Sequence, residues 1–281
     1  MTARRLTASA ITTLCLVMAV GCGGSSTPST PESEAKQRYG SFTAAVPGQL
    51  TVATNLPGPG FFDGDTPEDI HGGFEYAMAK EIAKRLGLPT VKVVNVSWDA
   101  LVAGQTEGFD LALSTINITP ERQKVVDFSV PYFNSEQGVL VRSGTKVDQS
   151  NLTSLRWGVQ SSSTSQAFLT TKIKPQREPS VYQDSASMVA ALASQQIDAV
   201  LLDTVVVLAQ AKESAGALQV VGQFKTGGVY GALFPKGDPN SAALNNVIKE
   251  LKSDGTLARL SAEILAPAFG EDPNKVPYLT P

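Results

Sequence analysis

The chain has 281 residues, of which 42% are hydrophobic and 17% are charged, and this composition suits one or two globular domains with a real core. The formal net charge of −3 and the lack of a Lys/Arg cluster argue against a nucleic-acid partner, because such partners require a basic face. The sequence contains no visible internal repeat and no coiled-coil heptad.

Residues 1–21 are predicted to be a lipoprotein signal peptide. Arg4 and Arg5 precede an apolar run from Ala10 to Val20 that is too short to span a bilayer and ends in small residues before Cys22. The segment resembles a bacterial lipoprotein signal, although Ala19 stands where that family more often has Leu. The resemblance implies an extracytoplasmic protein that is anchored to the cell membrane by a lipid on Cys22.

An ordinary signal-peptidase site near Cys22, with a soluble product, remains the alternative. Cys15 and Cys22 are the only cysteines, so the mature domain is expected to form no internal disulfide. Residues 22–48 are rich in Gly, Ser, Thr and Pro and hold few large apolar side chains. This composition predicts a flexible stalk.

Strands alternate with helices in the first half of the folded part. The patterns predict strands at 50–54, 91–96 and 109–113, helices at 74–86 and from Trp98, and a further helix that begins at Thr119 and Pro120. Glycine and proline fill the loop after Asn55. Such alternation predicts an α/β fold with a parallel sheet covered on both faces.

The second half repeats this organisation. An extended connector is predicted at 132–142, strands at 155–160, 199–202 and 230–234, and helices beyond Ser161, at 185–195, 242–253 and 257–265. A second α/β unit is therefore expected.

Arg122 falls in the first turn of the helix predicted after Pro120. A cation there is unfavourable beside the unpaired N–H groups of a helix start, unless a negative group joins it. The position therefore predicts an anion at Arg122. That anion is either a ligand or a carboxylate of the protein itself, such as Glu121 or Asp127.

Polar residues gather where predicted strands end. They are Asn55, the run from Ser114 to Asn117, the run from Ser161 to Thr164, and Asp203. Ligands of open α/β sheets bind at this edge. The hydroxyl groups and Asp203 have the alternative role of helix caps. Together with Arg122 they suit a small zwitterion, because a guanidinium pairs with a carboxylate and Asp203 accepts from an ammonium group.

The chain resembles the amino-acid-binding proteins of bacterial ABC importers, the family-3 solute-binding proteins. The resemblance rests on GFEYAMAKEIAKRLG, FDLALSTINITPERQKVVDFSVPY, GVQSSSTS, IDAVLLD, YGALFPKG and LKSDGT, in this order between Leu50 and Leu265. It implies a type II periplasmic-binding-protein-like fold of two α/β lobes with a two-stranded hinge. Lobe 1 would comprise residues 49–136 and 230–281, the latter including a C-terminal tail, and lobe 2 would comprise residues 137–229.

The same resemblance implies the site residues and the partners. The ligand carboxylate would bind Arg122 and the ammonium group would bind Asp203, with Thr115, Asn117, Ser163 and Thr164 supplying polar contacts and Trp98 a stacking aromatic ring. Trp98 has an alternative role as the core anchor of its helix. The partners implied are an amino acid and an ABC permease, for a monomer without a cofactor or metal.

Three positions depart from the family pattern. Asn55 stands where members that bind basic amino acids carry an acid, Gly58 stands where many have a second aromatic residue, and Ser162 replaces a glycine. The first departure disfavours a basic ligand, so we expect a neutral, polar side chain such as that of Gln or Ser. With glycine at position 58, Phe61 or Phe62 would have to complete the stacking.

Two other functional classes compete with transport. A secreted enzyme on the same fold, such as a cyclohexadienyl dehydratase, needs a general acid or base, and the only histidine, His71, lies in a predicted loop. No metal-ligand spacing or nucleophile elbow is visible. A sensory ectodomain would need a membrane-spanning segment after the domain, and none precedes Pro281.

Overall fold

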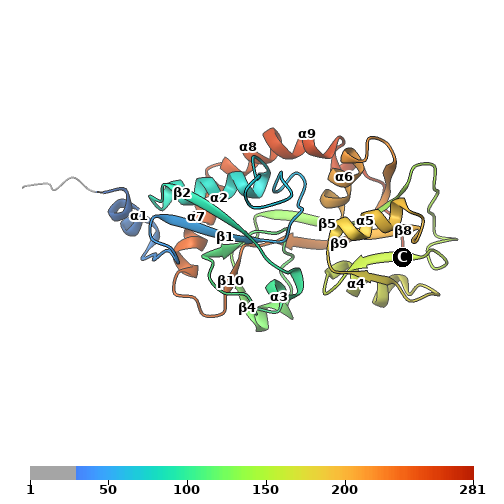
Figure 1. Ribbon diagram of the computed structural model, residues 1–281, viewed down its shortest axis with the longest axis horizontal. Helices are drawn as coiled ribbons and strands as arrows, with labels where there is room; N and C mark the ends of the chain where they lie inside the picture. Colours follow the sequence, from blue (N-terminus) through green and yellow to red (C-terminus); the bar gives the residue numbers. More distant parts are fainter. Residues whose placement is uncertain (1–29) are drawn as a thin grey trace, which may run out of the picture.

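The computed structural model describes residues 30–281 and shows two α/β lobes along the long axis of the molecule (Figure 1). One five-stranded sheet has the order β2-β1-β3-β10-β4 and the other the order β7-β6-β8-β5-β9. The predicted signal peptide and the lipidation of Cys22 lie outside the described residues. None of the helices between residues 30 and 281 is long and apolar enough to span a bilayer.

The first sheet is covered on both faces. Its strands are β1 (Gln49–Thr54), β2 (Thr90–Asn95), β3 (Leu111–Ala112), β4 (Val126–Phe128) and β10 (Leu233–Pro235), and β10 runs antiparallel to its neighbours. Leu50 and Val52 pack with the helices α2 (Phe74–Arg85), α7 (Ser241–Ser253) and α8 (Thr256–Leu260), whereas Ala53 packs with α3 (Trp98–Val102). Alternate side chains of one strand thus supply two cores.

The second sheet is also covered on both faces. It contains β5 (Phe133–Arg142), β6 (Trp157–Gln160), β7 (Ser180–Tyr182), β8 (Ala199–Asp203) and β9 (Leu218–Tyr230). Val139 and Leu201 pack on one face with Trp157, and Leu140 and Val200 pack on the other face with α5 (Ser185–Ala193). The remaining helices are α4 (Thr164–Phe168), followed by the π-helical turn η2 (Leu169–Ile173), and α6 (Thr204–Glu213).

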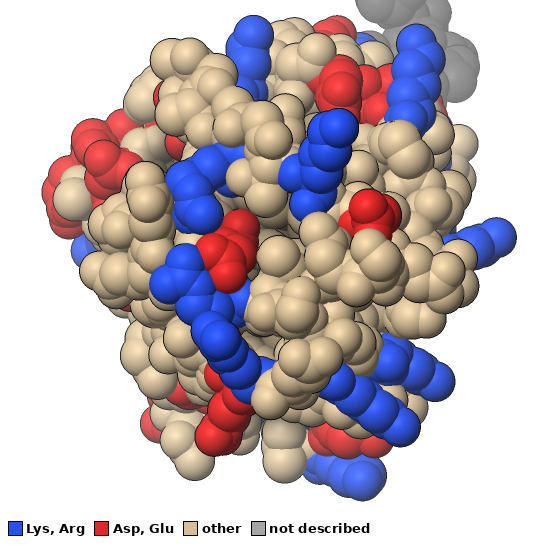
Figure 2. Space-filling view, turned by 90° about the vertical axis from the view of Figure 1, so that its right-hand side faces the viewer, with Lys and Arg blue, Asp and Glu red and all other residues tan. Residues whose placement is uncertain are grey.

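The two lobes differ in charge. Residues 137–229, which include most of the second sheet, hold eight Lys and Arg against six Asp and Glu, whereas residues 30–136 and 230–281 hold thirteen against twenty. Figure 2 faces the end of the molecule that the second sheet occupies, and Lys and Arg side chains project from much of this surface. The opposite net charges attract the lobes weakly, since salt screens them beyond about 10 Å.

Two strands connect the lobes. β5 and β9 pair at Phe133–Tyr230, Asn134–Val229 and Ser135–Gly228 before they continue into the second sheet. The extended connector predicted at 132–142 corresponds to β5, whereas β9 was expected only at its last residue, Tyr230. The two-stranded hinge is therefore confirmed.

The C-terminal tail makes a third connection. After η3 (Ser261–Leu265), α9 (Ala266–Phe269) and η4 (Pro273–Lys275), the chain pairs with β9 of the second sheet. Gln223 N donates to Pro277 O and Leu279 N donates to Gln223 O, both at 2.8 Å. The Leu279 side chain covers Gly222, where the Cβ atom of any other residue would lie 2.6 Å from Leu279 Cγ. A larger residue at position 222 would have to displace the Leu279 side chain.

The stalk prediction is wrong for residues 31–39. These residues form the helix α1 (Pro31–Tyr39), whose N-cap Thr30 accepts a hydrogen bond from Ser33 N and whose Ala35 and Tyr39 are buried. Polar composition hid this helix because its apolar face consists only of these two side chains, one turn apart. The cap and Pro31 at the first position are typical of a helix start.

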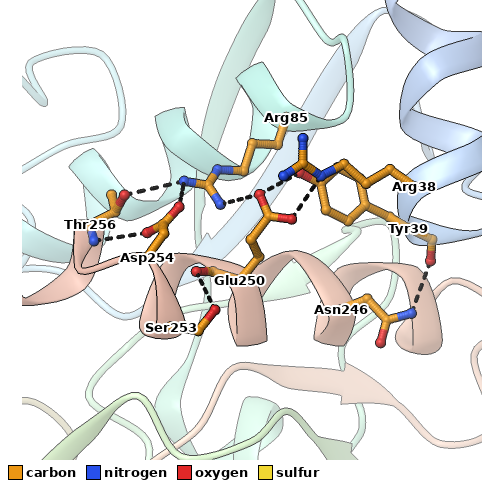
Figure 3. A network of polar contacts seen from close by, with 8 residues as sticks. All are labelled: Arg38, Tyr39, Arg85, Asn246, Glu250, Ser253, Asp254 and Thr256. Carbon is orange, nitrogen blue, oxygen red and sulfur yellow. Dashed lines mark hydrogen bonds and ion pairs between the residues drawn. The ribbon is translucent and has the colours of Figure 1, made fainter.

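A polar network holds α1 against α7 and α2 (Figure 3). Glu250 of α7 accepts hydrogen bonds from Arg38 Nε at 2.8 Å, Tyr39 OH at 3.0 Å and Arg85 Nη1 at 2.8 Å. Arg85 also pairs with Asp254 at 2.6 Å. Since the Arg85 side chain is only 15% exposed, its ion pairs are less screened than that of Arg38.

We expect Tyr39→Ala to lower the free energy of unfolding by about 3 kcal/mol, because a buried aromatic ring leaves a cavity. Tyr39→Phe should cost about 1 kcal/mol, the value of one hydrogen bond. Urea denaturation measures both. Arg38→Ala is the control, since its side chain is 64% exposed and such surface pairs contribute little. A Tyr39→Ala protein as stable as the wild type would show that α1 does not stabilise the first lobe.

Candidate ligand-binding site

A cavity lies between the two lobes, at the ends of β1, β3, β6 and β8. All eight site residues predicted from the sequence line it: Asn55, Trp98, Thr115, Asn117, Arg122, Ser163, Thr164 and Asp203. The first five come from the first lobe and the last three from the second. The carboxyl edges of the two sheets therefore face one another, as the strand order predicts.

Arg122 lies at the floor of the first lobe and is 7% exposed. Its Nη1 donates to Asn117 O at 2.7 Å and its Nη2 donates to Ser162 O at 3.1 Å. Its guanidinium carbon lies 5.1 Å from the centroid of the Trp98 ring, within the range of a cation–π contact. Two backbone carbonyls and a ring thus fix the direction of the guanidinium group.

The helix predicted after Pro120 is only the 3₁₀ turn η1 (Arg122–Lys124). Thr119 Oγ1 accepts from Arg122 N at 3.2 Å, so the predicted cap exists, but a single turn carries a much smaller dipole than a full helix. The turn does not extend into a longer helix, because the residues that follow it form β4. Burial, rather than a helix start, makes the charge of Arg122 costly.

No carboxylate of residues 30–281 forms an ion pair with Arg122. Of the two partners considered, Asp127 pairs with Lys236 Nζ at 2.7 Å, and Glu121 is exposed. Burial lowers the pKa of Arg122 to about 10, and the charge of Asp203 opposes this effect. A desolvated cation without a direct ion pair favours an anionic ligand group.

Asp203 ends β8 and stands at the N-cap position of α6. The alternative role of its side chain as a cap of this helix is wrong, because the carboxylate forms no capping hydrogen bond. It instead accepts from three neutral side chains: Asn117 Nδ2 at 2.8 Å, Tyr230 OH at 2.8 Å, and Gln137 Nε2. These donors hold the carboxylate at the cavity wall.

Burial raises the pKa of the Asp203 carboxyl to about 6, although the hydrogen bonds from Tyr230, Gln137 and Asn117 and the charge of Arg122 oppose this rise. Its three hydrogen-bond donors carry no charge. An ammonium group would supply the missing counter-charge and would lower this pKa. Arg122 of the first lobe thus favours an anionic ligand group, and Asp203 of the second lobe favours a cationic one.

The lobes contact each other across the cavity. Asn117 of the first lobe reaches Asp203 of the second, Arg122 reaches the carbonyl of Ser162, and Gln160 Nε2 lies 3.4 Å from Asn55 Oδ1. These bonds show that the structure has its lobes closed on the site.

The two predicted hydroxyl residues of the second lobe, Ser163 and Thr164, have different surroundings. Ser163 is the N-cap of α4, and its Oγ accepts from Gln166 N at 3.0 Å and donates to Gln160 O at 2.7 Å. The capping alternative is therefore right for Ser163. Thr164 Oγ1 accepts long hydrogen bonds from Gln137 Nε2 at 3.3 Å and from Asn117 Nδ2 at 3.4 Å.

Trp98 is a core residue that also lines the cavity. Its ring packs in the core with Leu101 and Phe109 and also lines the cavity. Phe61 and Phe62 line the cavity as well, so aromatic rings are present despite Gly58. Ser162, where the family pattern has glycine, has φ of +53°, a backbone conformation that suits glycine better.

The polar residues of this region that were not predicted include Gln137, Tyr230 and Glu75. Gln137 and Tyr230 bond to Asp203 from the hinge strands β5 and β9. The only feature of the sequence that could have pointed to Gln137 is that this polar side chain stands just before an apolar stretch of its strand. Glu75 follows Phe74 in the first turn of α2, where an acidic residue is ordinarily a favourable surface neighbour of the helix start.

Glu75 is fully buried and lines the cavity. Its Oε1 accepts from Thr115 N at 2.9 Å and from Tyr132 OH. Burial raises the pKa of Glu75 to about 7 against the opposing effect of these two hydrogen bonds. Among residues 30–281, Asp203 and Glu75 are the only acidic residues that line the cavity.

Within residues 30–281 no group of three or more His, Cys, Asp or Glu is placed to hold a metal ion. His71 is exposed, and its Nδ1 lies 2.9 Å from Asp69 O, outside the cavity lining.

The chain is similar to several proteins named for binding amino acids. The L-cystine-binding protein TcyJ of Escherichia coli strain K12 is 29% identical over 208 residues, which cover 72% of this chain and 76% of that protein. The ABC transporter glutamine-binding protein GlnH of Bacillus subtilis strain 168 is 31% identical over 192 residues, which cover 67% of this chain and 64% of that protein.

Among solved structures, an ancestral arginine-binding protein bound to glutamine superposes with a TM-score of 0.70 and 30% identity, covering 80% of this chain and 100% of that one. The family model of the bacterial extracellular solute-binding proteins, family 3, matches residues 50–266, well over half of the chain. The chain therefore belongs to the family-3 bacterial extracellular solute-binding proteins.

Proposed function

We propose that the protein captures a neutral polar α-amino acid between its lobes and delivers it to an ABC permease. One observation carries this proposal: a buried guanidinium group and a buried carboxylate, Arg122 and Asp203, line the same cavity from opposite lobes without forming an ion pair with each other. The α-carboxylate and α-ammonium groups of an amino acid complement them.

The energetics require both lobes. A hydrogen bond to a charged group contributes about 1.5 to 3 kcal/mol, and micromolar binding needs about 8 kcal/mol. Contacts with one lobe alone fall short of this value. A ligand that touches both lobes therefore favours the closed state by its difference in affinity for the two states.

The neutrality of the ligand side chain is supported by Asn55, which stands where members of the family that bind basic amino acids carry an acid. A relative named for glutamine binding and a similar structure with bound glutamine agree with this choice. We further propose that Cys22 carries a lipid, that the protein is a monomer outside the cytoplasm, and that it performs no catalysis.

A thermal-shift screen of residues 30–281 tests the proposal. A ligand present at 100 times its Kd stabilises the folded state by about 2.7 kcal/mol, so a neutral polar L-amino acid should raise the unfolding midpoint by several degrees. The D-enantiomer and the decarboxylated amine serve as controls and should give no shift. Stabilisation by sugars or polyamines in place of amino acids would contradict the proposed substrate class, and mass spectrometric detection of a changed ligand would favour an enzyme.

A further inference from the structure

Within residues 30–281, two buried polar atoms of cavity-lining residues have no hydrogen-bond partner. They are Oε2 of Glu75 and Nε1 of Trp98. Both residues are well buried, since Glu75 is 0% exposed and Trp98 is 8% exposed. Buried polar atoms of native proteins nearly always have partners, so two unpaired atoms on residues that line one cavity point to a ligand.

The two atoms have opposite hydrogen-bonding character. The indole Nε1–H of Trp98 can only donate, and the Oε2 atom of an ionised Glu75 can only accept. The other oxygen of Glu75, Oε1, is already engaged by Thr115 N and Tyr132 OH. These two bonds hold the carboxyl group in place, so that Oε2 keeps a defined position.

We infer that Glu75 and Trp98 recognise the side chain of the ligand and that this side chain is a carboxamide. Its NH₂ group donates to Glu75 Oε2 and its carbonyl oxygen accepts from Trp98 Nε1, while Arg122 and Asp203 hold the α-carboxylate and α-ammonium groups. This inference rests on the proposed function and narrows its substrate class to amino acids such as glutamine.

A carboxamide fits better than the alternatives. A guanidinium or ammonium side chain has no acceptor for Trp98 Nε1 and would leave this buried donor unpaired. A carboxylate side chain has no N–H donor for Glu75 and would place two acids together. An aliphatic side chain would leave both buried atoms unpaired, which is costly.

Calorimetric titration of residues 30–281 with four L-amino acids tests the inference. Glutamine should bind at least about 100-fold more tightly than norleucine, which has a similar chain length but lacks the amide, because sites built for a polar group reject analogues without it. Glutamate and arginine should also bind more weakly than glutamine. Glu75→Gln should weaken glutamine binding by about 30-fold and change norleucine binding by less than about threefold.

Trp98→Phe provides a second variant, since it removes the N–H group and keeps an aromatic ring. It should weaken glutamine binding about tenfold. Glu81→Gln is the matched control, because Glu81 lies on the same helix, α2, and does not line the cavity. Circular dichroism melting checks the fold of every variant, and Trp98→Phe keeps the inference testable if Glu75→Gln fails to fold.

The outcomes separate this inference from the proposed function. Equal affinity for glutamine and norleucine, or equal losses for both in Glu75→Gln, would overturn the carboxamide assignment and leave amino-acid binding intact. Tighter binding of arginine that is lost selectively in Glu75→Gln would show that the partner of Glu75 is a cation. If none of the four amino acids binds, the carboxamide assignment fails, and the proposed function fails as well only when no other neutral polar amino acid binds.

Discussion

Asp203→Asn is expected to weaken the affinity for the amino acid by about 100-fold or more. Removing one charge of a buried pair costs about 2 to 5 kcal/mol, and the ammonium group of the ligand would be left without a counter-charge. The new amide would also place N–H atoms beside Asn117, Gln137 and Tyr230, which all donate to this position now.

Calorimetry with the amino acid that stabilises the wild type most strongly measures this loss. Glu213→Gln is the control, since it neutralises an exposed acid at the far end of the same helix, α6. The variant should still unfold cooperatively, because Asp203 contributes a buried charge rather than packing volume. Unchanged affinity in Asp203→Asn would refute the role assigned to this carboxylate.

Asp203 also sets an expected pH dependence of binding. Its pKa is raised to about 6, so the carboxylate is ionised above pH 6 and can pair with ammonium there. As the pH falls below 6 the neutral acid becomes the main form, and protonation of Asp203 alone should lower the affinity by up to about tenfold per pH unit. Glu75 lines the same cavity with a pKa raised to about 7, so its protonation adds a loss that begins about one pH unit higher. The neighbouring Arg122 stays charged, with a pKa of about 10, and the pKa of Tyr230 lies well above 10.

Arg122→Lys should weaken binding by about 10- to 100-fold, although it keeps the positive charge. A lysine ammonium cannot bind a carboxylate with two parallel hydrogen bonds, and it lacks the plane that lies over Trp98. Arg122→Ala should lose more than about 100-fold. Arg122→Ala should be about as stable as the wild type or slightly more stable, because the buried charge that it removes has no ion-pair partner among the described residues.

Calorimetric titration and urea denaturation of the same preparations measure affinity and stability separately. Lys124→Ala, which removes an exposed neighbouring cation, should leave both unchanged. If Arg122→Lys binds as well as the wild type, charge alone is sufficient and the geometry of the guanidinium group plays no part.

Strong local patterns allowed much of the fold to be predicted from sequence. The four-residue spacing of Phe74, Met78 and Ile82 marks α2, and the apolar run from Ala199 to Leu202 marks β8. β9 was missed because Gly222, Lys225 and Gly227 interrupt any alternation of apolar and polar residues. Its pairing with β5 is a non-local interaction that no short window of sequence reveals.

The candidate site was predictable to the extent that its residues follow strands. Asn55 and Asp203 stand at strand ends, and Arg122 is unusual for its predicted surroundings. Glu75 could not be recognised, because its burial depends on Tyr132 and Thr115, which lie far from it in sequence. The prediction against a basic ligand rested on Asn55 and therefore overlooked the second carboxylate of the cavity.

The bonded C-terminal tail has a mechanical consequence. Helix α1 is fixed to the first lobe by Glu250 and lies at one end of the long axis, whereas the tail around Tyr278 is fixed to β9 at the other end (Figure 1). Helix α1 and the C-terminal tail are therefore attached to different lobes. A lipid attached ahead of α1 would hold the first lobe at the membrane. The second lobe would then move relative to it about the hinge, and the C-terminal tail would move with the second lobe.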